Sequence, residues 1–113
     1  MKIAAINPLK IKPFVRDVLE VWQLLNQVDT KNLSVSIIKL NGVNKKNRNK
    51  ASDVCYFVLE GEGKFNINGK DYPVKKNDLV TIPKNTWYFD LGKMTMLSFC
   101  NPRFDMKNVE VVD

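Results

Sequence analysis

Strand-length runs separated by turn residues fill the middle of the chain. Residues 55–59 are an apolar run, residues 60–63 contain two glycines where the backbone is predicted to turn, and residues 64–67 alternate apolar with polar side chains. Asn68-Gly69 then predicts a two-residue hairpin loop, because both positions of such a loop need positive φ. Pairing across this loop places four side chains on the buried face of an antiparallel sheet: Phe65, Ile67, Tyr72 and Val74.

The same rhythm continues toward the C-terminus. Residues 79–82 and 87–90 are predicted strands, and turns are predicted at residues 75–77, 83–85 and 91–93. Residues 94–100 then alternate, so that one face carries Met94, Met96, Ser98 and Cys100. Pro102 ends this strand, because proline cannot donate to a continuing ladder.

The first third of the chain is less regular. Residues 2–12 are predicted to form an arm or an edge strand, because Pro8 and Pro13 prevent a long regular element. The apolar positions in residues 14–25 fit both the periodicity of a helix and that of a strand, and the pattern alone favours the helix. Residues 33–40 are a clear strand whose one face carries Ser34, Ser36, Ile38 and Leu40. Both of its faces are partly apolar, which is typical of a barrel strand covered on two sides.

Two segments together resemble the conserved motifs of the cupin superfamily. Residues 56–63 (YFVLEGEG) resemble the end of the first cupin motif, and residues 77–88 (NDLVTIPKNTWY) resemble the second. Asn77 and Asn85 stand where the second motif has glycines, and asparagine tolerates the left-handed conformation that these turns need. The resemblance implies an all-β fold, a double-stranded β-helix or cupin-type jelly-roll barrel.

The length and the resemblance together predict how the chain is divided. The length of 113 residues predicts a single domain over residues 1–113. Within it we expect an arm and a strand or short helix in 1–32, the barrel core in 33–104 and a tail in 105–113 that packs on the outside of the barrel or on a second subunit. The resemblance favours a strand near residues 21–24 over the helix. Cupin barrels commonly associate through an outer sheet, so a homodimer is expected, with an exposed Trp22 or Trp87 in its interface.

The cupin metal ligands are missing from this chain, which contains no histidine. By position, the first-motif glutamate falls on Val54, and the second-motif histidine falls on Tyr88. The two first-motif histidines fall on Asn47 and Asn49, or on Arg48 and Lys50 if the spacer is one residue shorter. Transition metals prefer imidazole and carboxylate ligands, so neither a metal nor another cofactor is expected here.

The resemblance implies that alternate side chains of these strands face a cavity. Such an interior, with an apolar wall, phenols and a few amide or cationic groups, suits a small sugar-like or carboxylate ligand. The predicted ligand-binding residues are Asn47, Arg48, Asn49, Val54, Tyr56, Val58, Tyr88 and Asp90. The plainer alternative is that these side chains only fill a small barrel.

Two further functions stay open. One is a metal-independent isomerase or epimerase of sugar-type substrates, with Tyr88 as acid or base beside Asp90 or Asp53. The missing histidine weakens it, and the sequence shows no nucleophile elbow, Cys-His pairing or phosphate loop, so a non-enzyme is favoured. The other is a non-catalytic structural or interaction module.

Charge changes this picture little. The chain has 18 basic and 12 acidic residues, and residues 41–50 (NGVNKKNRNK) are its most basic stretch. No aromatic residue is interleaved there, so a solvated loop is favoured over a nucleic-acid contact. Cys55 and Cys100 lack metal-ligand spacing and are predicted to be small buried thiols. No segment resembles a membrane span or a signal peptide, which favours the cytoplasm.

Overall fold

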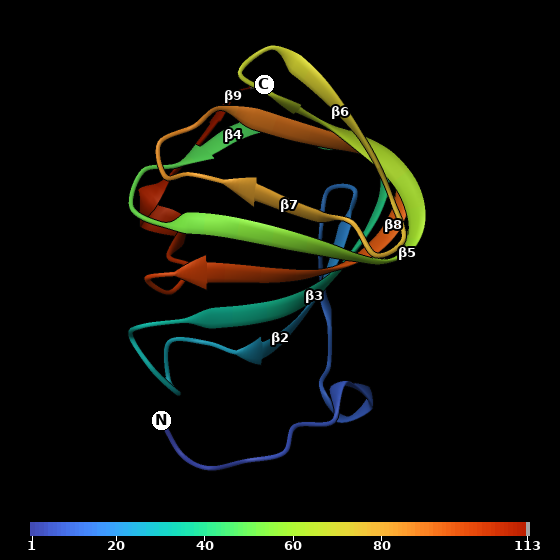
Figure 1. Cartoon of the computed structure of the whole chain (residues 1–113). Coiled ribbons are helices and arrows are strands. Elements are labelled where there is room, and N and C mark those ends of the chain that lie inside the picture. Colours follow the sequence, from blue (N-terminus) through green and yellow to red (C-terminus); the bar gives the residue numbers. More distant parts are fainter. Residues whose placement is uncertain (113) are drawn as a thin grey trace.

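The computed structural model describes residues 1–112, which form a curled antiparallel sheet (Figure 1). Its strands are β1 (Phe14–Arg16), β2 (Leu19–Leu25), β3 (Ser34–Val43), β4 (Lys46–Asn49), β5 (Asp53–Ile67), β6 (Lys70–Lys75), β7 (Leu79–Ile82), β8 (Tyr88–Asn101) and β9 (Val109–Val112). Two short 3-10 turns, Pro8–Lys10 and Met106–Asn108, complete the regular structure of these residues. The predicted all-β architecture is confirmed.

The two longest strands, β5 and β8, pair with each other and form the centre of the barrel sheet. The strand order runs β1-β2-β3-β8-β4-β9, and β5 pairs with β6, β7 and β8. The inner faces of these strands form a core at one end of the barrel, where Val58, Phe65 and Met96 are fully buried and Leu40 nearly so. The interior at the other end is hollow, and the candidate site lies there.

The predicted hairpin is present with its expected register. Asn68 and Gly69 have φ values of 50° and 82°, and Phe65 pairs with Tyr72. Asn77 and Asn85 also have positive φ, at 75° and 66°, as the two asparagine-for-glycine replacements require. Tyr72 was predicted on the buried face but is exposed, because among the described strands β6 pairs with β5 alone.

The turns predicted at residues 60–63 and 91–93 are wrong. β5 and β8 run straight through them, and Gly63 pairs directly with Gly92. A Cβ at Gly61 or Gly63 would lie 2.2 Å from a carbonyl oxygen of β8. These glycines therefore allow two backbones to approach closely instead of reversing the chain.

Residues 14–25 form strands, so the strand favoured by the resemblance is confirmed and the helix favoured by the pattern alone is wrong. β2 pairs with β3 from Leu19 to Leu25, and it buries Leu19 and Val21 on its inner face. Trp22 adds an apolar position on its outer face, and the combination imitates helical spacing. Residues 1–13 contain no strand and form an extended arm with one 3-10 turn.

The basic stretch 41–50 is not the continuous loop that its polarity predicts. β3 extends to Val43, and β4 pairs with both β8 and β9. The C-terminal tail was expected outside the barrel or on a second subunit. Instead β9 lies beside β4, and Val109 and Val111 line the hollow interior.

Candidate functional site

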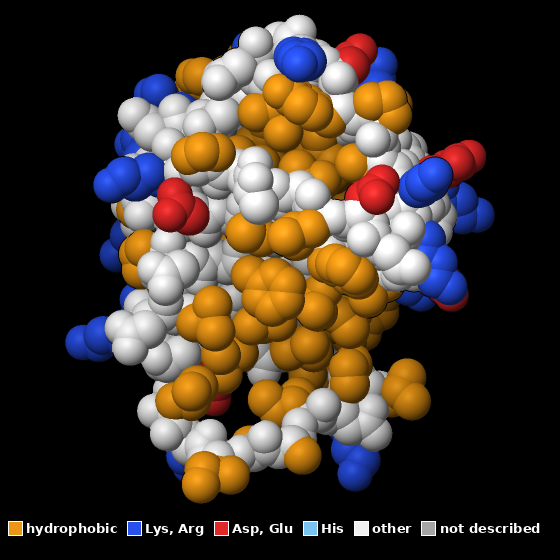
Figure 2. All heavy atoms as spheres, viewed as in Figure 1, with side chains coloured by type: hydrophobic (Ala, Val, Ile, Leu, Met, Phe, Trp, Pro, Cys, Tyr) orange, Lys and Arg blue, Asp and Glu red, His pale blue; other side chains and the backbone are white. Residues whose placement is uncertain are grey.

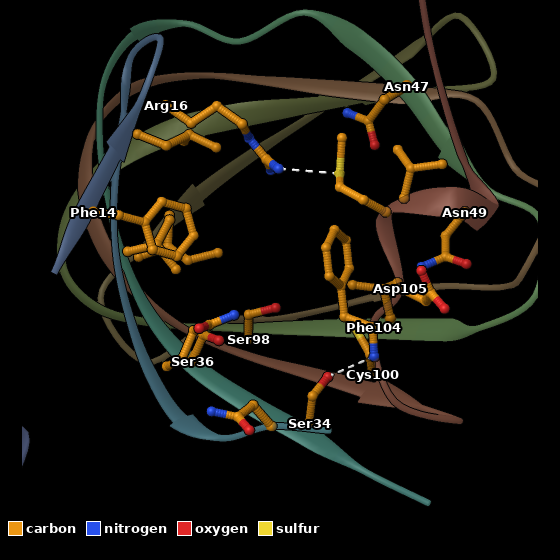
Figure 3. Close-up of a pocket in the computed structure, with 18 of the residues that line it drawn as sticks. Phe14, Arg16, Ser34, Ser36, Asn47, Asn49, Ser98, Cys100, Phe104 and Asp105 are labelled. Atoms are coloured by element: carbon orange, nitrogen blue, oxygen red, sulfur yellow. Dashed lines mark hydrogen bonds between the residues drawn. The ribbon is translucent and has the colours of Figure 1, made fainter. Parts of the chain in front are cut away.

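The hollow end of the barrel encloses a cavity of about 830 Å³ (Figure 3). Hydroxyl and amide side chains from several strands line it among apolar ones. They include Gln23, Ser34, Ser36, Asn47, Asn49 and Ser98. The alternation of strand side chains explains this lining, because the inward positions of β3, β4 and β8 at this end are small and polar.

Five of the predicted ligand-binding residues line this cavity: Asn47, Asn49, Val54, Tyr56 and Tyr88. Val58 faces the same interior but lies in the closed core, with no exposed surface. Asp90 is buried beside the cavity and accepts a hydrogen bond from Asn44 Nδ2 at 3.0 Å. Their roles in ligand binding stay predictions.

Arg48 points away from the cavity, so its predicted place in the ligand site is wrong. Its Nη2 lies 2.9 Å from Glu110 Oε1 on β9, and its guanidinium lies 4.7 Å from the ring centroid of Trp87. Lys50 lies on the same outer side, 3.4 Å from Glu110. The register of β4 against β9 therefore selects the Asn47 and Asn49 pair as the inward one.

Asp53 also lies outside the site. Its Oδ1 accepts a hydrogen bond from the backbone N–H of Lys84 at 2.9 Å, on the exposed side of β5. The pairing of Tyr88 with Asp53 as an acid–base couple is therefore wrong, and of the two candidate carboxylates only Asp90 is near the tyrosine.

Tyr56 and Tyr88 form a hydrogen-bonded pair in the wall of the cavity. Their hydroxyl oxygens lie 2.5 Å apart, and the buried ring of Phe65 packs against both, with centroid distances of 5.2 and 6.3 Å. Burial raises the pKa of both phenols well above the usual value, so both stay protonated at neutral pH. Their mutual bond uses one of two protons, which leaves one O–H group to donate to a ligand.

Asp90 is a buried carboxyl group near the Tyr56 and Tyr88 pair. Burial raises its pKa from 3.8 to about 6, although the hydrogen bond from Asn44 opposes the shift. Its negative charge in turn raises the pKa of Tyr56 and of Tyr88. A buried carboxyl group with a raised pKa therefore lies behind the cavity wall, near the two phenols.

Asp90→Asn is expected to stabilise the protein at pH 8. Between pH 4 and 6 the unfolded chain releases the Asp90 proton while the folded chain keeps it, so the stability contributed by this group falls as pH rises through that window. The shift of about two pKa units corresponds to about 3 kcal/mol, and the variant should lose this slope while its amide oxygen still accepts from Asn44. Urea unfolding from pH 4 to 8 measures it.

Asp71→Asn is the matched control for this change. Asp71 is exposed, and donors on Asn66 and Lys64 lower the pKa of its carboxyl, so its contribution to stability has the opposite dependence on pH. If Asp90→Asn were less stable than the unmodified protein at pH 8, the assigned direction of the Asp90 shift would be wrong.

Asn49 carries an unpaired donor in the cavity wall. Its Oδ1 accepts hydrogen bonds from the backbone N–H groups of Ala51 and Ser52, at 3.1 and 2.9 Å. Nδ2 has no hydrogen-bond partner within residues 1–112, although the residue is only 5% exposed. A buried amide N–H₂ without an acceptor is uncommon, because leaving it unsatisfied costs about 1–3 kcal/mol.

Arg16 was missed by the sequence analysis. It lies on β1 at the cavity, and its Nη1 donates to the thioether sulfur of Met106 at 3.1 Å (Figure 3). Its guanidinium lies 6.0 Å from the ring centroid of Phe104, and its charge lowers the pKa of Tyr88. A thioether is a weak acceptor, so most donors of this cation stay available. The ambiguous pattern of residues 14–25 gave no signal for this position.

The strand pattern of the sequence could have predicted that serines line the cavity. Ser34 and Ser36 alternate on the face of β3 that also carries Ile38 and Leu40, and Ser98 lies opposite Ser36 on β8. Ser34 Oγ already accepts from the backbone N–H of Phe104 at 2.8 Å. Polar side chains at inward strand positions indicate a polar cavity instead of a closed core.

The donor set at the cupin metal position does not fit a transition-metal ion. Neutral amides of Asn47 and Asn49, the apolar Val54 and a phenol with raised pKa on Tyr88 occupy the four places. Within residues 1–112, no three His, Cys, Asp or Glu side chains gather into a group that could hold a metal. The site therefore differs in chemistry from the metal centre that the family pattern implies.

Residues 35–89 match the family model described as the Cupin domain. This match covers just under half of the chain, and the barrel has the cupin-type jelly-roll fold of the solved structures that resemble it. Over its full length it is 25% identical to the uncharacterized protein MJ1618 of Methanocaldococcus jannaschii, of which 98% is covered. No helix within residues 1–112 has the length and apolar character needed to cross a membrane.

Solved structures share the fold at low identity. A Streptomyces PAC13 variant in complex with uridine has a TM-score of 0.89 and 21% identity, over 99% of this chain and 92% of that one. PAC13 is described as a unique nucleoside dehydratase. Ectoine synthase from P. lautus has a TM-score of 0.83 and 14% identity, over 98% of this chain and 91% of that one.

Proposed function

We propose that the barrel cavity binds a small organic molecule that has several hydroxyl groups and one acidic group, such as a sugar acid or a nucleotide. The observation that carries this proposal is the unpaired, buried Nδ2 of Asn49 at the cavity wall. This nitrogen has almost no accessible surface, so the side chains that cover it would move aside on binding; an oxygen atom of a ligand would then satisfy the donor and remove the cost of leaving it unpaired.

The remaining polar groups favour a hydroxyl-rich ligand. The Tyr56 and Tyr88 hydroxyls and the serine hydroxyls of β3 and β8 both donate and accept, which matches the same property of a sugar hydroxyl. The apolar wall, including Val54 and Val21, suits the C–H face of a sugar ring or a base.

Arg16 favours an acidic group on the ligand. Its guanidinium is a charged donor at the cavity, and among the described residues its one hydrogen-bond partner is the thioether of Met106. A carboxylate or phosphate would replace that weak contact with charge-assisted hydrogen bonds, which are roughly twice as strong as neutral ones. The complex of PAC13 with uridine supports a ligand of nucleoside size in a barrel of this shape.

Thermal shift against paired probes tests the proposal. Uridine 5′-monophosphate and glucuronate are the acidic members of the two pairs, and uridine and glucose are the neutral ones. A probe that binds only the folded state raises Tm by mass action, so at least one pair should raise it, with the acidic member more effective at low salt. Equal shifts for both members would contradict the role of Arg16, and no shift from any of the four would contradict the ligand class.

A second function is favoured by one specific observation. Asp90 has a raised pKa near 6 and lies beside the Tyr56 and Tyr88 pair, an arrangement that could move a proton to or from a bound sugar without a metal. This is the metal-independent isomerase or epimerase alternative. Proton NMR of a bound probe incubated for hours distinguishes the two, because a catalyst converts the probe and a binding protein returns it unchanged.

A further inference from the structure

Met106 is a methionine that lies both at the cavity and at the surface. It lines the cavity and is 48% exposed, whereas Met94 and Met96 are buried in the core. The fourth methionine of the chain, Met1, is 83% exposed but lies on the N-terminal arm, outside the cavity lining. A dissolved oxidant therefore reaches the thioethers of Met106 and Met1, and the two core thioethers are shielded.

The thioether of Met106 connects two parts of the cavity wall that are far apart in the sequence. Its sulfur accepts a hydrogen bond from Arg16 Nη1 at 3.1 Å, which joins β1 to the 3-10 turn before β9 (Figure 3). The Arg16 guanidinium also lies over the ring of Phe104, in the segment that leads to this turn. We call the hydrogen bond between Arg16 and Met106 the cavity tie.

The two ends of the cavity tie are held with unequal firmness. On the Met106 side, the backbone N–H of Phe104 donates to Ser34 Oγ at 2.8 Å, and the side chain of Asp105 caps the 3-10 turn. On the Arg16 side, β1 is three residues long, exposed throughout and, among the described strands, paired with β2 alone. The cavity tie is therefore an additional attachment of this edge strand to the barrel.

Arg16 differs from the basic side chains that only face solvent. On the face of the molecule in Figure 2, Lys and Arg side chains protrude at the border, where water solvates them. Arg16 lines the cavity instead, and among the described residues the thioether of Met106 is its hydrogen-bond acceptor. A thioether is a weak acceptor, so a stronger acceptor in the same place would compete with an acidic ligand for this cation.

We propose that Met106 is an oxidation site that controls whether Arg16 is available to an acidic ligand. Hydrogen peroxide transfers one oxygen atom to the sulfur, which is oxidised from a thioether to a sulfoxide, and the peroxide is reduced to water. The control of ligand binding rests on the proposed function, whereas the oxidation and its effect on β1 do not.

The sulfoxide strengthens the cavity tie. Its oxygen is a polar acceptor, and a hydrogen bond from a charged donor to such an oxygen is roughly twice as strong as one between neutral groups. The methionine side chain is flexible and Met106 is half-exposed, so the oxygen can turn toward the guanidinium while the backbone stays in place. Arg16 then stays on Met106, and the acidic group of a ligand loses its partner.

Hydrogen exchange of the ligand-free protein tests the cavity tie. Peroxide treatment should add one oxygen atom to the peptide that contains Met106, and the amides of β1 should then exchange at least about 3-fold more slowly. Met106→Gln carries an amide oxygen near the place of the sulfoxide oxygen and should slow the same amides without peroxide. Unchanged exchange in both proteins, or a Met106 that resists peroxide after Met1 is oxidised, would overturn the proposal.

Calorimetry with one acidic and one neutral probe tests the effect on ligand binding. Oxidation should weaken the binding of uridine 5′-monophosphate at least about 5-fold and leave that of uridine nearly unchanged, because only the phosphate needs Arg16. Reduction by methionine sulfoxide reductase should restore the lost affinity. Equal losses for both probes would contradict control through Arg16. If neither probe binds the unoxidised protein, the proposed function fails and this control with it, while hydrogen exchange still decides whether oxidation strengthens the cavity tie.

Met106→Leu is the matched control for oxidation elsewhere in the chain. It keeps Met1 and the partly exposed Cys55, which peroxide also reaches, and removes only the thioether at the cavity. A leucine of similar volume at this half-exposed position should preserve the fold. Peroxide should change neither the exchange of β1 nor the affinity for uridine 5′-monophosphate in this variant. An equal response in Met106→Leu and in the unmodified protein would place the effect at another residue and overturn the assignment of Met106.

Discussion

Gly63→Ala is expected to prevent folding or to cost more than about 4 kcal/mol of stability. A Cβ at this position would lie 2.2 Å from the carbonyl oxygen of Leu91 and 2.9 Å from Cε of Met94. The oxygen belongs to the backbone of β8, so it cannot move without disturbing the pairing of the two longest strands. Gly63 has no positive φ, so the loss comes from this contact alone. Soluble yield and urea unfolding measure it.

Gly69→Ala is the control that separates contact from conformation. Gly69 has a φ of 82°, but no atom lies within 4 Å of a Cβ built there. Its substitution should cost only about 1–2 kcal/mol, the price of a left-handed alanine. If Gly63→Ala were as stable as Gly69→Ala, the close approach of β5 and β8 would not be required by the fold.

Asn49→Asp is expected to remove ligand binding while it preserves the fold. The substitution keeps an oxygen in the place of Oδ1, so the turn N–H groups of Ala51 and Ser52 keep their acceptor. It removes the unpaired Nδ2 donor and adds a negative charge at the cavity wall. The affinity for the best acidic probe should fall at least about 10-fold, since losing a charged or neutral hydrogen bond costs about 1–3 kcal/mol. Isothermal titration calorimetry measures the change.

Asn32→Asp makes the same chemical change far from the cavity. Asn32 is exposed and outside the cavity lining, so its variant should bind the probe as the unmodified protein does. Unchanged affinity in Asn49→Asp would show that the Asn49 amide does not contact the ligand. The unpaired Nδ2 would then no longer support the proposed function.

Much of the fold could be predicted because its signals are local. Asn68-Gly69 specifies a hairpin, and asparagines at positions 77 and 85 specify left-handed turns, each through its own backbone preference. The glycines at 61 and 63 were misread as a turn, because a close strand crossing and a chain reversal select the same residue. Only the pairing of β5 with β8, which is not local, distinguishes them.

The site could be predicted in part for the same reason. Tyr56, Tyr88 and Val54 follow from strand alternation once the motif positions are known. The choice between the Asn47 and Asn49 pair and the Arg48 and Lys50 pair depends on the register of β4 against β9, which no local pattern records. Arg16 reaches the cavity from a three-residue strand in a segment of ambiguous period.

The most direct measurement of the proposed function follows the side-chain amide of Asn49 by 15N-edited NMR during titration with the acidic probe that gives the largest thermal shift. The bound oxygen should move both Nδ2 proton resonances of Asn49, together with ring resonances of Tyr56 and Tyr88, and the amide of Asn32 should stay in place. Shifts confined to residues outside the cavity, or an Asn49 amide unmoved at saturation, would contradict the assignment of this cavity as the ligand site.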